Sequence, residues 1–398
     1  MSLKDRMLKS KAEPKPEPAP ESDVVLTPKA PPEKKAPLKK GKTQVPYAQA
    51  VVDKLKKKLT SKKAEASNVS LLSGGEVLSD VSEWIPTGFP PLDKIMGGGW
   101  AVGRATELFG KEGSGKSALC HRAIKQCQDM GGMVIYIDFE NALDSDKMEQ
   151  IGIDPDRLIY CTPDYVEQAW DIVWEAIDHM KQFPPEAPTL IIWDSVAASV
   201  PKAELQEETA ENSHVGLLAR AMAKGCRTMY RAIAKVRAHM IFVNHMTFKI
   251  GGNSRFPEII TPGGVEVKYA VSARVQTSIR QRIKGKDDGP SGYMIACNTH
   301  KCRLFPPHRK ANWVLDFKYG PSPEMTALHL MIAAGAIKSV GQGAYVGSWS
   351  KKQFTKDNWM SRLEEDPEFK AAALATFEEG VKSGKFPVTI DDASEDDD

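Results

Sequence analysis

The residues best suited to chemistry form one short glycine-rich loop, which fits the pattern G-x-x-x-x-G-K-[ST]. Its members are Gly110, Lys111, Glu112, Gly113, Ser114, Gly115, Lys116 and Ser117. Backbone N–H groups of such a loop converge on phosphate oxygens, and the N-terminus of the following helix adds a favourable partial charge. We therefore expect Lys116 to reach the β- and γ-phosphates of ATP and Ser117 to bind Mg²⁺.

A second element of this chemistry is an apolar strand that ends in a carboxylate. The run 189–193 is followed by Asp194. In proteins with such a loop, a neighbouring parallel strand delivers an Asp to the Mg²⁺ site, usually through a water molecule. Asp194 is therefore predicted to complete the metal site with Ser117.

The strand-like run 133–139 brings two further acids, Asp138 and Glu140, to its carboxyl end. A carboxylate in that place can orient and deprotonate the water that attacks the γ-phosphate. Alternation puts both acids on the same face of the strand, so periodicity does not choose between them.

Two long stretches, 202–214 and 246–262, have little helix or strand pattern. The first is acidic and precedes a helix on which Arg220 and Arg227, seven residues apart, share a face. The second contains Lys249 and Arg255. Loops of this length in a compact domain are usually functional or mobile. Both would leave the nucleotide edge, where the state of the γ-phosphate could control the binding of a large ligand.

These residues need a frame of alternating strands and helices. Strand-like runs are expected at 106–109, 133–139, 189–193 and 240–244, helices at 117–130, 166–182 and 216–238, and β-rich stretches at 265–279 and 293–299. Helical patterns follow at 325–334, 352–363 and 367–383. The alternation predicts an α/β fold with a mostly parallel sheet covered by helices on both faces.

The composition divides the chain into five predicted parts. They are a Lys/Pro/Glu-rich tail (1–46), a helix with a linker (47–83), a core (84–328), a small C-terminal lobe (329–388) and an acidic tail (389–398). Tyr47, Val51, Leu55 and Leu59 recur every four residues among lysines, which predicts an amphipathic helix with a basic face. We expect this helix to dock on another surface, such as that of a neighbouring subunit.

The bulk properties exclude several classes of protein. The net charge is +2, and the six cysteines include no C-x-x-C pair, which argues against a disulfide framework and a zinc ribbon. No apolar run reaches 18 residues, so no membrane span is expected.

Several stretches together resemble the bacterial RecA-type recombinases. Besides the loop with Glu112, they are Ile85-Pro86-Thr87-Gly88, the segment from Tyr136 to Asp144, Asp194-Ser195-Val196-Ala197-Ala198 continuing to Glu204, and Asn212-Ser213-His214-Val215-Gly216-Leu217. They occur in the family's order and at its spacing, so the match is specific.

The resemblance implies roles that spacing leaves open. It makes Glu140 the general base, Asp138 a supporting acid and Asp144 a contact of the adenine. It also implies that Arg220, Arg227, Lys249, Arg255, Gly263 and Gly264 contact DNA. Lys147 stands where the family has an aromatic residue that stacks on adenine, and Pro262 stands where it has a glycine.

Three further residues are implied to act on the γ-phosphate. Lys301 and Arg303 match a lysine pair that reaches the γ-phosphate held by the adjacent subunit, where an arginine resembles an arginine finger. His245 matches a glutamine that senses the γ-phosphate.

The resemblance implies a P-loop core and a DNA-dependent ATPase. Such a protein forms filaments on single-stranded DNA and promotes homologous pairing and strand exchange in repair or replication. It uses ATP and Mg²⁺, binds single- and double-stranded DNA and further copies of itself, and works with single-strand-binding and loader proteins in the cytoplasm of a bacterium or a phage-infected host. The alternatives are a ring helicase with the same core and a non-catalytic mediator that binds other recombinases.

Overall fold

The computed structural model describes residues 45–60, 81–205, 216–248, 259–285 and 289–389. The chain divides into two compact units, Met1–Glu76 and Val77–Asp398. In the first unit, helix α1 spans Val45–Thr60, where an amphipathic helix was expected, and Val51 and Leu55 are exposed on it. Within the described ranges no helix is long and apolar enough to cross a membrane.

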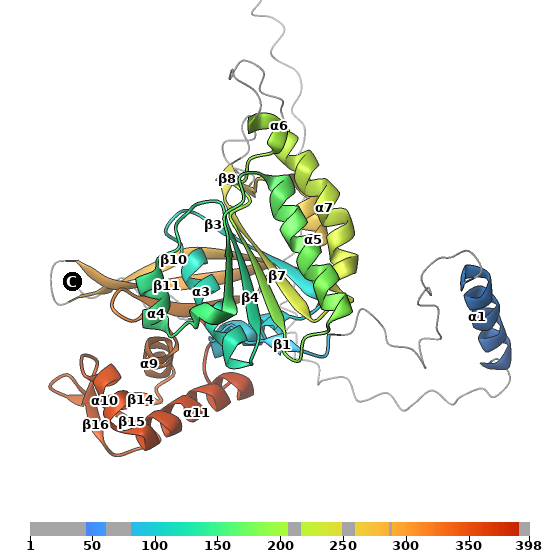
Figure 1. Cartoon of the computed structure of the whole chain (residues 1–398). Helices are drawn as coiled ribbons and strands as arrows, with labels where there is room; N and C mark the ends of the chain where they lie inside the picture. The colour runs from blue at the N-terminus through green and yellow to red at the C-terminus, as the bar shows by residue number, and fades with distance from the viewer. Residues whose placement is uncertain (1–44, 61–80, 206–215, 249–258, 286–288, 390–398) are drawn as a thin grey trace, which may run out of the picture. The chain divides into compact units, whose positions relative to one another are not determined.

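A large sheet forms the centre of the second unit, with the strand order β13-β12-β11-β10-β3-β7-β6-β4-β5 (Figure 1). Its strands are β3 (Arg104–Gly110), β4 (Met133–Asp138), β5 (Leu158–Cys161), β6 (Thr189–Asp194), β7 (Ala238–His245), β10 (Ala273–Lys284), β11 (Pro290–Cys302), β12 (Lys310–Asp316) and β13 (Gly320–Ser322). Neighbouring strands from β10 to β5 are parallel, and those from β10 to β13 are antiparallel.

Helices cover both faces of this sheet because its central strands are apolar on both sides. Along β4, Val134 and Tyr136 face one core cluster, whereas Ile135 and Ile137 face the other. The first cluster is closed by α2 (Pro90–Met96), α3 (Lys116–Asp129) and α4 (Ser145–Ile151), and the second by α5 (Val166–Gln182), α7 (Leu217–Ile233) and α8 (Gly264–Ala270). The predicted α/β fold with a mostly parallel sheet is confirmed.

A third core cluster lies in residues 323–389, which we call the α9–α11 region. It contains α9 (Pro323–Ala333), β14 (Ile337–Gly341), β15 (Ala344–Gly347), β16 (Gln353–Thr355), α10 (Trp359–Glu365) and α11 (Pro367–Ser383). Trp359, Phe354 and Phe369 pack on one another at its centre. The shorter elements of the second unit are β1 (Trp84–Ile85), β2 (Trp100–Ala101), the 3₁₀ turn Pro155–Arg157, α6 (Lys202–Leu205), β8 (Thr247–Phe248) and β9 (Ile259–Ile260).

Three details of the predicted frame were wrong. Residues 264–270 form helix α8 rather than strand, because Gly263 adopts the left-handed conformation that begins the helix, although Val265, Val267 and Tyr269 alternate as in a strand. Residues 353–355 form β16, so helix α10 begins only at Trp359. Finally, β8 and β9 pair as an antiparallel hairpin stem inside the stretch 246–262 that had no predicted structure.

Candidate functional site

The glycine-rich loop joins β3 to α3 at the carboxyl edge of the sheet. Gly113 and Gly115 have φ angles of 69° and 84°, a conformation that glycine adopts without strain. Ser114 Oγ donates to the carbonyl of Lys111 at 2.7 Å and lies 2.8 Å from Thr277 Oγ1 on β10. The loop is therefore held in its curved shape from inside and from the neighbouring strand.

Lys116 points its ammonium group into this curve. The residue is 7% exposed, and Nζ donates to the carbonyls of Gly110 at 3.3 Å and Lys111 at 3.0 Å. Burial lowers the pKa of Lys116, although the nearby carboxylates of Asp194 and Glu140 oppose that effect. A phosphate placed in the loop would give this partly desolvated cation an anionic partner.

Ser117 and Asp194 lie in contact at the carboxyl edge of the sheet. Ser117 Oγ donates to Asp194 Oδ2 at 3.3 Å, and the buried hydroxyl of Tyr136 donates to the same oxygen at 2.6 Å. Burial raises the pKa of Asp194 to about 6. The pair offers a hydroxyl and a carboxylate oxygen, the hard ligands that Mg²⁺ takes alongside water and nucleotide phosphates, so the residues present fit that metal.

Glu140 lies beside this pair and is held by two hydrogen bonds. Its Oε1 accepts from Ser195 Oγ at 2.5 Å and lies 3.0 Å from His245 Nε2. Burial alone would raise the pKa of Glu140, but these hydrogen bonds outweigh it, and the pKa is lowered. Glu140 is therefore held as a carboxylate with one oxygen, Oε2, outside these contacts.

Asp138 has a different environment, which separates it from Glu140. Its carboxylate accepts from the backbone N–H groups of residues 140, 141, 142 and 143 at 2.8–3.3 Å, and from the Tyr160 hydroxyl at 3.1 Å. Asp138 thus shapes the turn that carries Glu140. This geometry supports Glu140 rather than Asp138 as the base.

Asn244 connects His245 to the end of the second long loop. Its Oδ1 accepts from the His245 backbone N–H at 2.9 Å, and its Nδ2 donates to the Pro262 carbonyl at 3.0 Å. The same Nδ2 donates to Glu107, a fully buried carboxylate that is paired with Arg274 at 2.5 Å. A continuous polar network thus runs from Glu140 to the residue before Gly263.

Gly263 and Gly264 begin α8 and lie where a side chain would not fit. A Cβ on Gly263 would come within 2.6 Å of Val196, two residues after Asp194, and one on Gly264 within 2.8 Å of Ala219 on α7. Arg220 and Arg227 are both exposed on α7. Lys249 and Arg255 lie outside the described residues.

Asp144 is the N-cap of α4. Its carboxylate accepts from the backbone N–H groups of Asp146 and Lys147 and forms a 2.9 Å ion pair with the Lys147 ammonium. Lys147 also lines a cavity of about 800 Å³ with His121 and Ala118, which lie on α3 just after the glycine-rich loop.

Lys301 and Arg303 do not reach the glycine-rich loop of their own chain. Lys301 Nζ donates to the carbonyls of Lys268 at 2.5 Å, Val271 at 2.8 Å and Tyr269 at 3.3 Å, at the C-terminus of α8. Arg303 donates to Tyr269 at 2.8 Å. Burial, with the nearby charges of Arg303 and Arg274, lowers the pKa of Lys301 to about 8.

Sequence reasoning gave no role to four residues that position this site. Ser195 holds Glu140, Tyr136 holds Asp194, Asn244 holds Pro262, and Thr277 supports the glycine-rich loop. All four lie in stretches already singled out, but only the pairing of the strands shows which side chains meet.

Comparison with known proteins agrees with this geometry. The family model of the RecA N-terminal domain matches residues 53–322. Protein RecA of Bifidobacterium breve is 36% identical over 284 residues, which cover 69% of this chain and 70% of that relative. Protein RecA of Synechocystis sp. is 33% identical over 315 residues (79% and 86%), and protein RecA of Thermus aquaticus is 36% identical over 286 residues (71% and 81%). The chain belongs to the RecA family of ATP-dependent recombinases, which act in homologous recombination and repair.

Proposed function

We propose that this chain is a DNA-dependent ATPase that polymerises on single-stranded DNA and promotes homologous pairing and strand exchange. The observation that carries the proposal is the polar network that joins Glu140 to Pro262. Glu140 lies beside Ser117 and Asp194, and Pro262 lies at the end of the second long loop. This network gives a physical route by which a nucleotide could control a DNA-binding loop.

On the nucleotide side, the glycine-rich loop and Lys116 would bind the phosphates of ATP. Ser117 and Asp194 would hold Mg²⁺, which neutralises charge on the phosphates during transfer. Glu140 would orient the attacking water and accept its proton through the oxygen outside its contacts with Ser195 and His245. Asp144 and Lys147 would contact the base.

On the DNA side, Arg220 and Arg227 would bind phosphates from α7, together with Gly263, Gly264, Lys249 and Arg255. When His245 turns from Glu140 to a γ-phosphate, its backbone would shift Asn244 and with it Pro262. The close packing of Gly263 against Val196 gives a second contact, between the segment that follows Asp194 and the start of α8. Hydrolysis would reverse these changes and weaken the hold on DNA.

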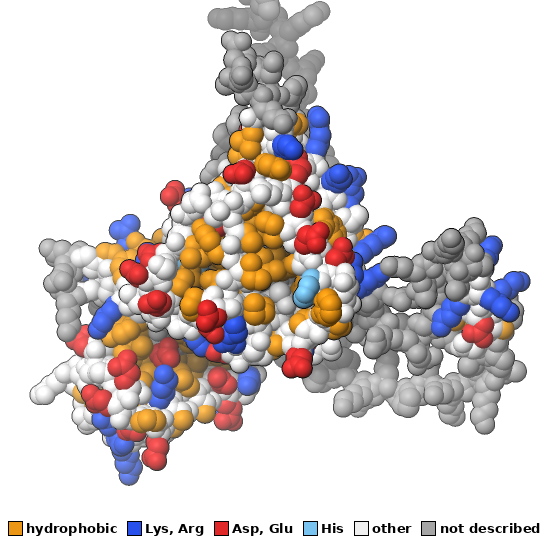
Figure 2. Space-filling view, viewed as in Figure 1, with side chains coloured by type: hydrophobic (Ala, Val, Ile, Leu, Met, Phe, Trp, Pro, Cys, Tyr) orange, Lys and Arg blue, Asp and Glu red, His pale blue; other side chains and the backbone are white. Residues whose placement is uncertain are grey.

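A filament would complete the site. Lys301 and Arg303 of one subunit would leave the C-terminus of α8 and bind the γ-phosphate held by the next. Helix α1 would dock on a neighbouring core, and its exposed Val51 and Leu55 require an apolar surface there. Figure 2 shows hydrophobic side chains gathered on the face near α5, and Ile159 and Tyr160 on the edge strand β5 are 48% and 45% exposed. This face suits such a contact.

The test uses the full chain with ATP and Mg²⁺, with and without single-stranded DNA. We expect DNA-stimulated release of phosphate and, in the same sample, open helical filaments by electron microscopy. Lys116→Ala is the control that should lose both. Closed rings would instead indicate the helicase, and filaments without hydrolysis would indicate a non-catalytic mediator.

A further inference from the structure

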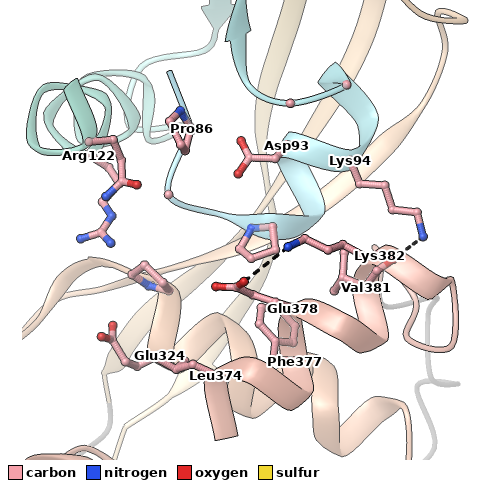
Figure 3. Close-up of a pocket in the computed structure, with 16 residues that line it drawn as sticks. Pro86, Asp93, Lys94, Arg122, Glu324, Leu374, Phe377, Glu378, Val381 and Lys382 are labelled. Atoms are coloured by element: carbon pink, nitrogen blue, oxygen red, sulfur yellow. Dashed lines mark hydrogen bonds and ion pairs between the residues drawn. The ribbon is translucent and has the colours of Figure 1, made fainter. Parts of the chain in front are cut away.

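A cavity of about 680 Å³ lies between the core and helix α11, beside the middle of α3 (Figure 3). Its core side is formed by residues 86–98 and by Arg122 and Gln126 on α3, and its other side by α11 and the start of α9. The volume lies within the range of small-molecule sites, which often occur between domains.

Arg122, on the wall of this cavity, has a buried donor that lacks an acceptor in the described ranges. Its Nε is buried and has no hydrogen-bond partner within the described part of the chain. Burial lowers the pKa of Arg122, although the carboxylates of Glu324 and Asp129 oppose that effect. Gly88 makes room for it, since a Cβ there would lie 2.5 Å from that Nε and Gly88 has a φ of 85°. Glu324, which also lines the cavity, thus offsets part of the desolvation of the guanidinium, whereas Nε is left without an acceptor among the described residues.

The other charged groups around the cavity are already engaged. Glu378 pairs with Lys382 at 3.6 Å, Glu324 pairs with Lys370 at 3.4 Å, and Lys94 donates to the carbonyl of Val381. Two anions, Glu324 and Glu378, therefore face three cations, Lys94, Arg122 and Lys382, among the lining residues. With Asp93 neutral, the cavity carries one net positive charge.

Asp93 lies opposite α11 and points into the cavity (Figure 3). Its Oδ1 accepts from the Thr87 N–H at 2.7 Å. Burial raises its pKa to about 7, with Glu378 adding to that effect and Lys382 opposing it. At neutral pH much of Asp93 can therefore donate a hydrogen bond.

Apart from Gln126, the rest of the lining carries no polar side chain, and it includes one aromatic ring. Leu374, Phe377 and Val381 come from α11, and Pro86, Pro90 and Pro323 from the other side. A phosphate dianion would meet the carboxylates of Glu324 and Glu378 without enough free cations to balance it. A single carboxylate matches the one guanidinium, and a ring matches the apolar wall.

We propose that this cavity binds a small aromatic monocarboxylate, whose carboxylate pairs with Arg122 and whose ring lies against Phe377 and Leu374. Arg122 lies five residues after Ser117 on the helix that follows the glycine-rich loop. A ligand here is therefore placed to alter the position of that helix, and through it the nucleotide. The site is independent of the proposed strand exchange.

The test is calorimetric titration of the full chain with benzoate, in saturating ADP and Mg²⁺ so that the glycine-rich loop is occupied. Benzamide, which has the same shape without the charge, is the matched ligand. Arg122→Gln removes the guanidinium, and Lys125→Gln on the same helix, which pairs with Asp129 outside the cavity, is the matched variant. Leu374→Trp fills the cavity and leaves Arg122 in place.

We expect benzoate to bind the wild type and the Lys125→Gln variant equally. Binding should fall at least about tenfold for benzamide and for Arg122→Gln, and should be lost in Leu374→Trp. No benzoate binding at about 10 mM would overturn the proposal. Equal binding of benzamide, or unchanged binding by either cavity variant with a native circular dichroism spectrum, would also overturn it.

Discussion

The two groups of residues proposed to meet the γ-phosphate are prepared very differently. Lys116 donates hydrogen bonds to carbonyls of the glycine-rich loop, and Ser117 donates one to Asp194 at the end of β6. Lys301 and Arg303 instead bind the carbonyls at the C-terminus of α8. The half of the site around the glycine-rich loop is therefore assembled within one chain. The cations proposed for the other half are held at the C-terminus of α8.

The difference suggests how binding of ATP could be communicated. The C-terminus of a helix attracts cations through its partial negative charge, but a triphosphate attracts them far more strongly. Moving Lys301 and Arg303 to a neighbour's γ-phosphate would free the C-terminus of α8, whose N-terminus carries Gly263 and Gly264. The cationic pair would thus report nucleotide binding to the DNA loop of its own subunit.

The largest effect is expected when Lys301 and Arg303, the cationic pair, are both removed. The double variant Lys301→Ala, Arg303→Ala should lower DNA-stimulated ATP hydrolysis by about 10³-fold or more, as loss of an arginine finger does. Binding of a fluorescent ATP analogue in the absence of DNA should change little, because the glycine-rich loop is untouched. Steady-state hydrolysis and analogue titration measure the two effects, and equal losses in both would show that the pair acts within its own subunit.

The half of the site that is assembled within one chain can be tested through Glu140, its proposed base. Glu140→Gln should slow hydrolysis by about 10²- to 10⁴-fold while ATP binding is retained. Asp138→Asn should cost less, because Asn still accepts one of the backbone hydrogen bonds that hold the turn. Single-turnover hydrolysis distinguishes them, and a greater loss for Asp138→Asn would make Asp138 the base.

The pKa of Lys301 predicts that ATP hydrolysis depends on pH. The lowered pKa of Lys301, about 8, means that the folded chain loses this charge as the pH rises through that value. Hydrolysis at subsaturating ATP, where Lys301 is still held on α8, should therefore fall above about pH 8, by up to about tenfold per pH unit. Lys301→Arg should remain active there, since arginine keeps its charge. Parallel pH profiles of the two proteins test this, and identical profiles would contradict it.

The smallest expected effects concern DNA. Arg220→Ala and Arg227→Ala should each reduce the slope of log affinity against log salt by about 1, because each removes one phosphate contact. Lys125→Ala on α3 is the control that should leave the slope unchanged. Fluorescence anisotropy on a labelled oligonucleotide at several salt concentrations measures it. A slope that neither arginine changes would remove α7 from the DNA surface.

Sequence alone could predict the frame because buried parallel strands are continuous apolar runs, as in 189–193. It failed at 264–270, where strand-like alternation competes with the helix start that Gly263 provides. Asp194 was predictable from its place after a strand, but the contact of Ser195 with Glu140 was not. That contact depends on the register that pairs Asp138 of β4 with Asp194 of β6, which no local pattern specifies. The hold of Lys301 on α8 likewise depends on tertiary contacts between distant segments.

The central claim is that the two halves belong to different subunits, and mixing two inactive variants tests it most directly. Glu140→Gln lacks the base but keeps Lys301 and Arg303, and the double variant Lys301→Ala, Arg303→Ala has the opposite defect. If the site is shared, an equal mixture on single-stranded DNA should regain hydrolysis at about a quarter of its interfaces, those that combine two intact halves. If the mixture stays as inactive as its components while still forming filaments, both halves act within one chain and the account is wrong.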